Sequence, residues 1–243
     1  MIFVLSPAKT MEIHPTSNFD VPCFHAQAVE LAQQLAMYDV EVLEQMMKIK
    51  PELAMTVKSQ YQDFDNQHTL VKDAYQGLVF KHLNLKDKNS NQLAYFQKHV
   101  RILSALYGLL KGNDGICAYR LDPIHKVNHQ SLYQYWGNLI AKELDGKLIV
   151  NLASKEYEKL IKPYIPKEQW IDVVFLVEKK GKLVSQATFA KMARGELLSY
   201  AIEHEVTEPQ VLQQFQGLGF RFEPSLSHDY LYTFVKGASL CES

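Results

Sequence analysis

Hydrophobic residues along this chain fall either into short continuous runs or at helical spacing. Residues 2–5 and 148–151 are nearly continuous apolar runs, which is typical of strands buried on both faces. Ser6-Pro-Ala-Lys9 follows the first run and Asn151-Leu-Ala-Ser154 ends the second, and Ser is a favoured helix cap. Both runs are therefore predicted to be strands that lead into helices. If the two strands are neighbours, their ends share one crevice.

Most other apolar positions recur every three or four residues and predict helices. Alternating positions predict a hairpin of residues 171–177 with 182–187, and an edge hairpin of residues 220–223 with 230–235. Residues 10–23 are expected to be a loop and residues 237–243 a frayed tail. The expected helices cover residues 24–38, 43–57 (two helices), 69–80, 90–110, 131–144 with a break at Gly137, 155–161, 189–207 and 211–215.

Residues 101–110 are expected to carry part of a functional site. At 100° per residue, a helix here places five apolar residues on one face and Arg101, Ser104 and Gly108 on the other. Gly108 would cost such a helix roughly 1 kcal/mol relative to Ala, so it favours a close approach by a ligand or by another helix. Arg120 follows soon after and forms either an anion clamp with Arg101 or an ion pair with Asp122.

Composition is ordinary for a globular protein, with 47% apolar and 22% charged residues among 243 and a formal net charge of −1. Without repeats or linkers, the chain is expected to be a single domain, residues 1–243, of α/β (mixed α+β) class, in which helices flank a mixed sheet. Three separated cysteines indicate neither a disulfide framework nor a zinc ribbon. No apolar run is long enough for a membrane helix, and the expected location is cytoplasmic.

Residues 43–57, within a segment of about 41–60, fit the apolar skeleton of a helix-hairpin-helix inserted after the first strand. In that motif, two glycines free backbone amides to meet DNA phosphates, but here Lys48 and Lys50 occupy those positions. The alternative is two short packed helices joined by a turn. His125 and His129 are spaced i, i+4 but lack the adjacent Glu of a metalloprotease helix, so no metal and no cofactor are expected.

Six short motifs in order resemble those of the YaaA peroxide-stress family, and the resemblance covers essentially the whole chain. The motifs are Ser6-Pro-Ala-Lys9, Arg101-x-Leu-Ser-x-Leu-Tyr-Gly-Leu-Leu110, Tyr119-Arg120, Tyr133-x-Tyr-Trp-Gly137, Asn151-Leu-Ala-Ser-x-Glu-Tyr157 and Phe189-Ala-x-x-Ala-Arg-Gly195.

The resemblance implies a cytoplasmic protein of hydrogen peroxide response and iron homeostasis, with a helix-hairpin-helix, a positively charged cleft and duplex DNA binding. Family members are thought to limit unincorporated iron and so to reduce hydroxyl-radical damage. The Lys-Ile-Lys turn departs from the glycine-rich form of the hairpin. The resemblance therefore leaves DNA binding through the charge of the two lysines, rather than through free backbone amides.

Read chemically, the motif residues describe an anion site with few carboxylates. Such a site is poorly suited to iron, which requires a compact set of His, Asp or Glu ligands, so an effect on iron is expected to be indirect. The candidate DNA- or anion-binding cations are Lys9, Lys48, Lys50, Arg101, Arg120, Lys191 and Arg194, and the candidate crevice residues are Ser6, Ser104, Tyr107, Tyr119, Asn151, Ser154 and Tyr157.

Three roles remain open for these residues. The first is non-sequence-specific DNA binding by a stress protein. The second is an enzyme that acts on a nucleotide or a modified nucleobase, for which no pair of residues identifies a general base. The third is a satisfied buried network that only fixes the fold.

Overall fold

The first strand occupies the middle of the sheet. A computed structural model describes residues 1–237, so the expected tail lies, beyond Gly237, outside the described residues. All four residues of β1 (Ile2–Leu5) are buried. This strand pairs in parallel with β10 (Ile149–Asn151) on one side and with β5 (Val100–Ser104) on the other. The sequence prediction of two buried strands is confirmed, and the two are neighbours.

Nine strands form the main mixed sheet, in the order β13-β14-β15-β11-β10-β1-β5-β6, with β12 paired to β11. The five strands from β15 to β5 are parallel, whereas the outer pairs are antiparallel. The hairpin of β14 with β15 forms as predicted, but β15 is an inner strand between β14 and β11. The remaining strands of this sheet are β6 (Gly108–Leu110), β11 (Trp170–Lys179), β12 (Lys182–Val184), β13 (Gln216–Gly217), β14 (Phe220–Phe222) and β15 (Leu231–Lys236).

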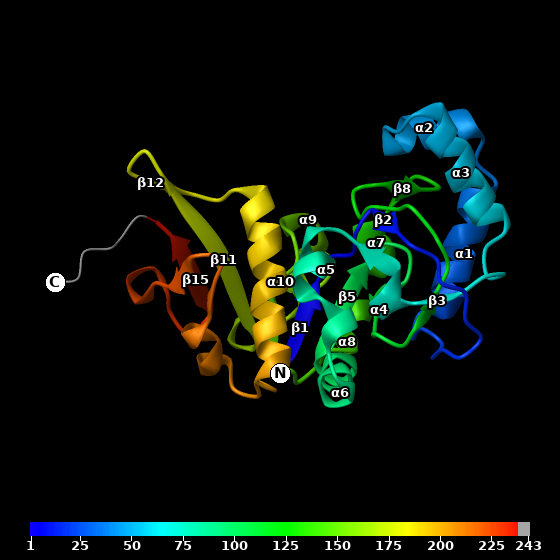
Figure 1. Cartoon of the computed structure of the whole chain (residues 1–243). Coiled ribbons are helices and arrows are strands. Elements are labelled where there is room, and N and C mark those ends of the chain that lie inside the picture. The colour runs from blue at the N-terminus through cyan, green and yellow to red at the C-terminus, as the bar shows by residue number, and fades with distance from the viewer. Residues whose placement is uncertain (238–243) are drawn as a thin grey trace.

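The longest helix, α10, lies along the sheet beside α5, while α1, α2 and α3 gather at the end of the molecule opposite β12 and β15 (Figure 1). The helices are α1 (His25–Ala36), α2 (Val40–Met47), α3 (Pro51–Gln62), α4 (Val71–Ala74), α5 (Leu78–Leu83), α6 (Ser90–His99), α7 (Leu132–Trp136), α8 (Leu139–Lys142), α9 (Lys155–Glu158) and α10 (Ala187–Glu203). Short 3-10 helices cover Leu85–Asp87, Lys162–Tyr164, Lys167–Gln169, Pro209–Gln214 and Pro224–Leu226. Three small two-stranded sheets add β2 (Thr10–Met11) with β4 (Tyr75–Gln76), β3 (Thr69–Leu70) with β7 (Gly115–Ile116), and β8 (Lys126–Val127) with β9 (Gln130–Ser131).

The prediction of a helix over residues 101–110 is wrong. Helix α6 is capped by Asn89 and ends at His99, and the chain then forms the antiparallel hairpin β5–β6. Gly108 has φ +68°, a left-handed conformation that glycine adopts without strain, and a Cβ there would lie 2.9 Å from Phe24 and Trp136. Every residue from Ile102 to Leu110 is buried. With both faces covered, the apolar spacing carries no information about period, and the helical pattern was coincidental.

Two other local expectations are also wrong. No helix begins at Ser6-Pro7, because the chain runs instead into β2, which pairs with β4. Residues 69–80 are not one helix but β3, α4, β4 and the start of α5. Gly77 has φ +146° and separates β4 from α5, and a Cβ there would lie 3.3 Å from Cβ of Ala8.

Candidate anion-binding pocket

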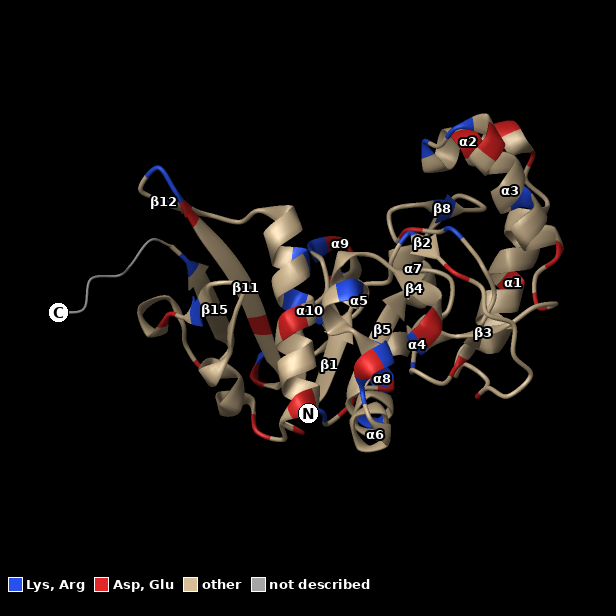
Figure 2. Cartoon of the chain, in the orientation of Figure 1, with Lys and Arg blue, Asp and Glu red and all other residues tan. Residues whose placement is uncertain are grey.

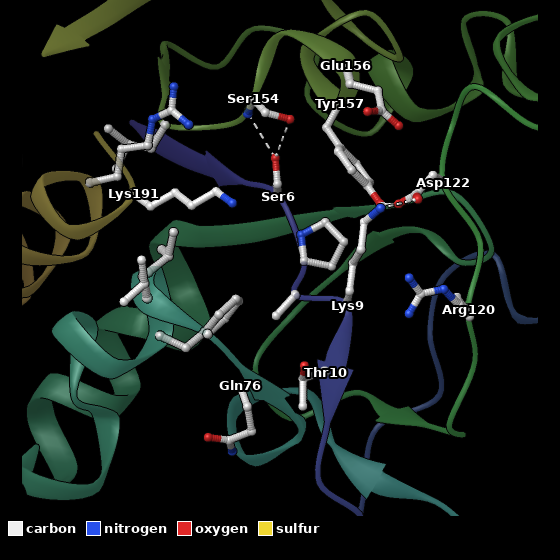
Figure 3. Close-up of a pocket in the computed structure, with 18 of the residues that line it drawn as sticks. Ser6, Lys9, Thr10, Gln76, Arg120, Asp122, Ser154, Glu156, Tyr157 and Lys191 are labelled. Carbon is white, nitrogen blue, oxygen red and sulfur yellow. Dashed lines mark hydrogen bonds and ion pairs between the residues drawn. The ribbon is translucent and has the colours of Figure 1, made fainter. Parts of the chain in front are cut away.

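A cavity of about 490 Å³ opens where β1 and β10 end (Figure 3). Ser6 follows β1 and Ser154 precedes α9, and the Ser6 hydroxyl donates a hydrogen bond to Oγ of Ser154 over 3.2 Å. The backbone N–H of Ser154 in turn donates to Oγ of Ser6 over 2.8 Å. The two junctions therefore share one crevice, at the carboxyl ends of parallel strands where α/β proteins commonly bind ligands.

Eight of the fourteen candidate residues line this pocket. They come from four distant parts of the chain: the segment after β1, the loop before Asp122, the segment after β10, and α10. Residues 76–80, around the start of α5, complete the wall. The eight are Ser6, Lys9, Tyr119, Arg120, Ser154, Tyr157, Lys191 and Arg194.

One side of the pocket is built around the carboxylate of Asp122. Nζ of Lys9 lies 2.8 Å from Oδ2 of Asp122, and the Tyr157 hydroxyl donates to Oδ1 over 3.1 Å. The backbone N–H of Asp122 donates to Nδ1 of His125, which gives that imidazole a structural role. Asp122 thus pairs with Lys9, whereas the sequence alternative had paired it with Arg120.

Two charged groups at the pocket have buried atoms without a hydrogen-bond partner in the described chain: Oε1 of Glu156 and Nε of Arg194. Burial, with Asp122 nearby, raises the pKa of the Glu156 carboxyl, and burial lowers the pKa of the Arg194 guanidinium. A buried polar atom that lacks a partner destabilises the folded chain by about 1–3 kcal/mol. Both groups are therefore arranged to gain from a ligand.

A chain of hydroxyl groups supports the floor of the pocket. Oγ of Ser104 accepts hydrogen bonds from the backbone N–H groups of Leu106 and Tyr107, so its own proton is free to go to the Tyr119 oxygen, 2.7 Å away. The hydroxyls of Tyr119 and Tyr75 lie 2.8 Å apart. Burial raises the pKa of Tyr119 to about 12. Tyr119 is thus a neutral phenol at physiological pH and can donate a hydrogen bond into the pocket.

Three candidate residues have structural roles elsewhere. Nη1 of Arg101 donates to the carbonyl oxygens of Gln97 and Val100 at the end of α6. The Asn151 amide is fully engaged with Glu158, Asp172 and the Ala153 N–H, and the Tyr107 hydroxyl accepts from the Cys117 N–H. For these residues the interpretation as a satisfied buried network fits best.

Asp122, Glu156, Thr10 and Gln76 line the pocket but are absent from the candidates made from the sequence. Asp122 had been weighed only as an ion-pair partner for Arg120. Glu156 lies inside the motif of residues 151–157, and that position was the only signal that could have selected it. The pocket consequently carries charges of both signs, and a purely basic cleft stays a prediction.

Lys48 and Lys50 lie outside the pocket, in the turn between α2 and α3, and both are exposed. Lys48 has φ +51° and ψ +53°, the left-handed conformation that glycine favours. The carboxylates of Glu41, Glu44 and Glu52 lie on the same two helices, and Figure 2 shows the mixed colours of α2. Two helices joined by a turn are present here, whereas their role as a DNA-binding motif stays a prediction.

None of the helices within residues 1–237 combines the length and apolar character needed to cross a bilayer. The cytoplasmic location remains a prediction.

Comparison with known proteins gives a consistent result. The model of a family described as peroxide stress protein YaaA matches residues 1–226. A UPF0246 protein of Agathobacter rectalis is 34% identical over 97% of this chain and 99% of its own length. UPF0246 proteins of Acaryochloris marina and Ligilactobacillus salivarius are each 35% identical, over 97% of this chain and all of theirs. The similarity thus covers nearly the whole chain.

Proposed function

Because this chain belongs to the peroxide stress protein YaaA family, we propose that it serves the peroxide response by binding an anionic, nucleotide-like ligand in the strand-end pocket. The observation that carries the proposal is the buried, unpartnered Nε of Arg194, on the same face of α10 as Lys191 and beside the same cavity. Arginine is the side chain best suited to bind phosphate bidentately. The Ser6 and Ser154 hydroxyls add short polar contacts.

The other side of the pocket suits the neutral part of such a ligand. The phenols of Tyr119 and Tyr157 and the carboxyl groups of Asp122 and Glu156 offer hydrogen-bond donors and acceptors for a sugar or a base. Leu78, Phe80 and Leu152 contribute apolar surface. A cavity of about 490 Å³ lies within the range of typical small-ligand sites.

The test is calorimetric titration with a nucleoside 5′-monophosphate and with the matching nucleoside. We expect the monophosphate to bind at least about tenfold more tightly, because a charge-assisted hydrogen bond contributes roughly 1.5–3 kcal/mol. Arg194→Lys keeps the positive charge but removes the planar guanidinium group with its Nε. This change should reduce the preference for the monophosphate over the nucleoside. Lys180→Ala, at the exposed β11–β12 turn, is the matched control and should leave it unchanged. Equal affinity for the two ligands would refute phosphate recognition by this pocket.

A catalytic use of the same pocket is favoured by Glu156. Its raised pKa and buried unpartnered oxygen are typical of a carboxyl group that acts as a general acid or base. If the protein acts on a nucleotide or a modified nucleobase, Glu156→Gln should retain ligand binding and lose turnover in a chromatographic product assay. If the native protein returns every nucleotide unchanged, the pocket only binds.

DNA binding is the second candidate function, favoured by the left-handed Lys48 at a position where the helix-hairpin-helix motif has glycine. In a fluorescence-anisotropy titration of a labelled duplex, each phosphate contact contributes about 0.9 to the slope of log affinity against log salt. Changing both Lys48 and Lys50 to Ala should therefore reduce that slope by about two units. The control changes Lys180 and Lys182 to Ala.

An unchanged slope in the variant of Lys48 and Lys50 would place DNA contacts elsewhere on the molecule. Absence of binding by the native protein at low salt would remove the DNA proposal and leave the pocket proposal untouched. A role in limiting iron stays a prediction at this stage.

A further inference from the structure

A second cluster of chemically active side chains lies outside the pocket, beside the small sheet of β3 and β7. We infer that Asp65, His68 and Cys117 bind one divalent cation of the zinc class. The three ligand atoms, a carboxylate oxygen, an imidazole nitrogen and the thiol sulfur, all lie within 4.8 Å of one another. This site is independent of the proposed pocket function and involves none of its residues.

Backbone pairing places two of the three ligands opposite each other. In the antiparallel pair β3–β7, Thr69 faces Ile116 and Leu70 faces Gly115. His68 directly precedes β3 and Cys117 directly follows β7, so continuing the same register sets His68 opposite Cys117. Because the register is fixed by hydrogen bonds of buried strands, the two side chains are held near each other without a disulfide or other link.

The loop before β3 returns the third ligand to the same point. Asp65 has φ +74°, a left-handed conformation that turns the chain sharply. Its Oδ1 lies 2.9 Å from Nε2 of His68. Tetrahedral zinc with nitrogen and sulfur ligands has ligand-to-ligand distances of about 3.3–3.7 Å, as follows from its bond lengths. To hold a cation, the Asp65 and His68 atoms would therefore separate slightly from 2.9 Å, while the wider separations in the cluster, at most 4.8 Å, would contract.

The surroundings orient two of the three ligands, His68 and Asp65. The ring of Phe19 stacks on the His68 imidazole at 4.4 Å between centroids, which restricts its rotation. Nε2 of His25 lies 3.5 Å from Oδ2, the other oxygen of Asp65, and Nδ1 of His25 is buried without a partner among residues 1–237. A residue such as His25, which contacts a metal ligand without binding the metal itself, holds the carboxylate in one orientation and tunes its affinity for the metal.

A bound cation deprotonates a coordinating thiol, so Cys117 would bind the cation as its thiolate. Cys117 also lines an open cavity with Gln67 and Ile13, which gives a cation and a fourth, water ligand a route to the site.

One sulfur, one nitrogen and one oxygen form a donor set of borderline softness, which favours Zn²⁺, Co²⁺ or Fe²⁺ over Mg²⁺ or Ca²⁺. Three protein ligands leave one position for water or another small molecule. The site differs from the pair His125 and His129, for which no metal was expected and where His125 accepts a backbone hydrogen bond.

The test is titration of reduced, metal-free protein with Co²⁺, whose bond to a thiolate gives a charge-transfer absorption band. We expect one equivalent of Co²⁺ to produce this band. Added Zn²⁺ should displace the Co²⁺ and so remove the band. Cys117→Ser should abolish the band, and His68→Gln should weaken binding at least about 100-fold, because loss of even an outer partner typically reduces affinity 10–100-fold. Asp65→Asn, in an exposed loop, tests the third ligand without disturbing the core.

Cys23→Ser is the matched control, since Cys23 is the other free thiol among the described residues and is not one of the three proposed ligands. It should leave the band and the affinity unchanged. Far-ultraviolet circular dichroism of each variant separates loss of binding from loss of folding. The inference is overturned if the native protein gives no thiolate band, or if the band survives in both Cys117→Ser and Asp65→Asn. In that case Asp65 and His68 form only an ion pair, beside the buried thiol of Cys117.

Discussion

At the scale of single residues, Asp114 gives a direct prediction about stability and pH. Burial raises the pKa of its carboxyl to about 6, although Oδ2 accepts a hydrogen bond from the Lys111 N–H. Because the folded chain holds this proton more tightly than the unfolded chain, the free energy of unfolding rises as the pH falls from about 7 towards 4. Ionised Asp114 destabilises the fold by up to about 3 kcal/mol.

Asp114→Asn should therefore be more stable than the native protein at pH 8 by about 1–3 kcal/mol and should have a flatter pH profile between 4 and 7. Urea unfolding monitored across this pH range measures both effects. Asp229→Asn, at an exposed position, should leave the profile unchanged. A variant at Asp114 that is less stable at every pH would show that the carboxylate's hydrogen bond outweighs its burial.

The meeting of Ser6 and Ser154 was predicted because parallel strands present their carboxyl ends at one edge. Arg101 and Asn151 lie outside the lining of the pocket. The sequence could not show this, because an arginine or an asparagine whose side chain is bound within the fold looks the same in sequence as one that binds a ligand. Only the distances distinguish the two cases.

At the scale of elements, apolar spacing succeeded for helices with one exposed face. Helix α1 alternates between buried and exposed positions and was predicted within two residues at each end. Prediction from apolar spacing failed for β5–β6, whose residues are buried on both faces. It also failed for residues 69–80, where the elements of two to six residues are too short to show a period.

Gly108 makes the β5–β6 hairpin sensitive to the addition of a single methyl group. Gly108→Ala adds the strain of a left-handed conformation, roughly 1–2 kcal/mol, to a clash with Phe24 and Trp136 that should cost about 1–3 kcal/mol more. Gly146→Ala is the matched control, because Gly146 has φ +66° but no atom within 4 Å of the added Cβ. Thermal or urea unfolding should show the larger loss for Gly108. Equal losses of stability in the two variants would mean that the rings of Phe24 and Trp136 move aside at little cost.

At the scale of the whole molecule, the pocket depends on how closely α5 and α10 approach. A Cβ on Gly195 would lie 2.3 Å from the Val79 carbonyl oxygen. His82 and Glu196 join the same two helices through a 2.7 Å contact between Nδ1 and Oε1. Since α5 and α10 pack against each other and both line the pocket, the spacing between them affects the shape of the pocket.

Gly195→Ala should push these helices apart and weaken binding of a nucleoside monophosphate more than it lowers the melting temperature. Overpacking costs about 1–3 kcal/mol, partly offset by the roughly 1 kcal/mol that Ala gains over Gly within a helix. Calorimetric titration beside a thermal melt checks the two effects. Unaltered affinity would show that the pocket tolerates a change in helix spacing. No sequence pattern predicted this contact, because it joins residues more than a hundred positions apart.

The central position of β1 also has a consequence for synthesis. This apolar strand is made before both of its partners, which begin at Val100 and Ile149. At about 5–20 residues per second, a ribosome needs roughly 7–30 s to go from β1 to the end of β10. Until its partners are made, β1 lacks the neighbours of its sheet, so chaperones that recognise short apolar stretches have time to bind it before the domain closes.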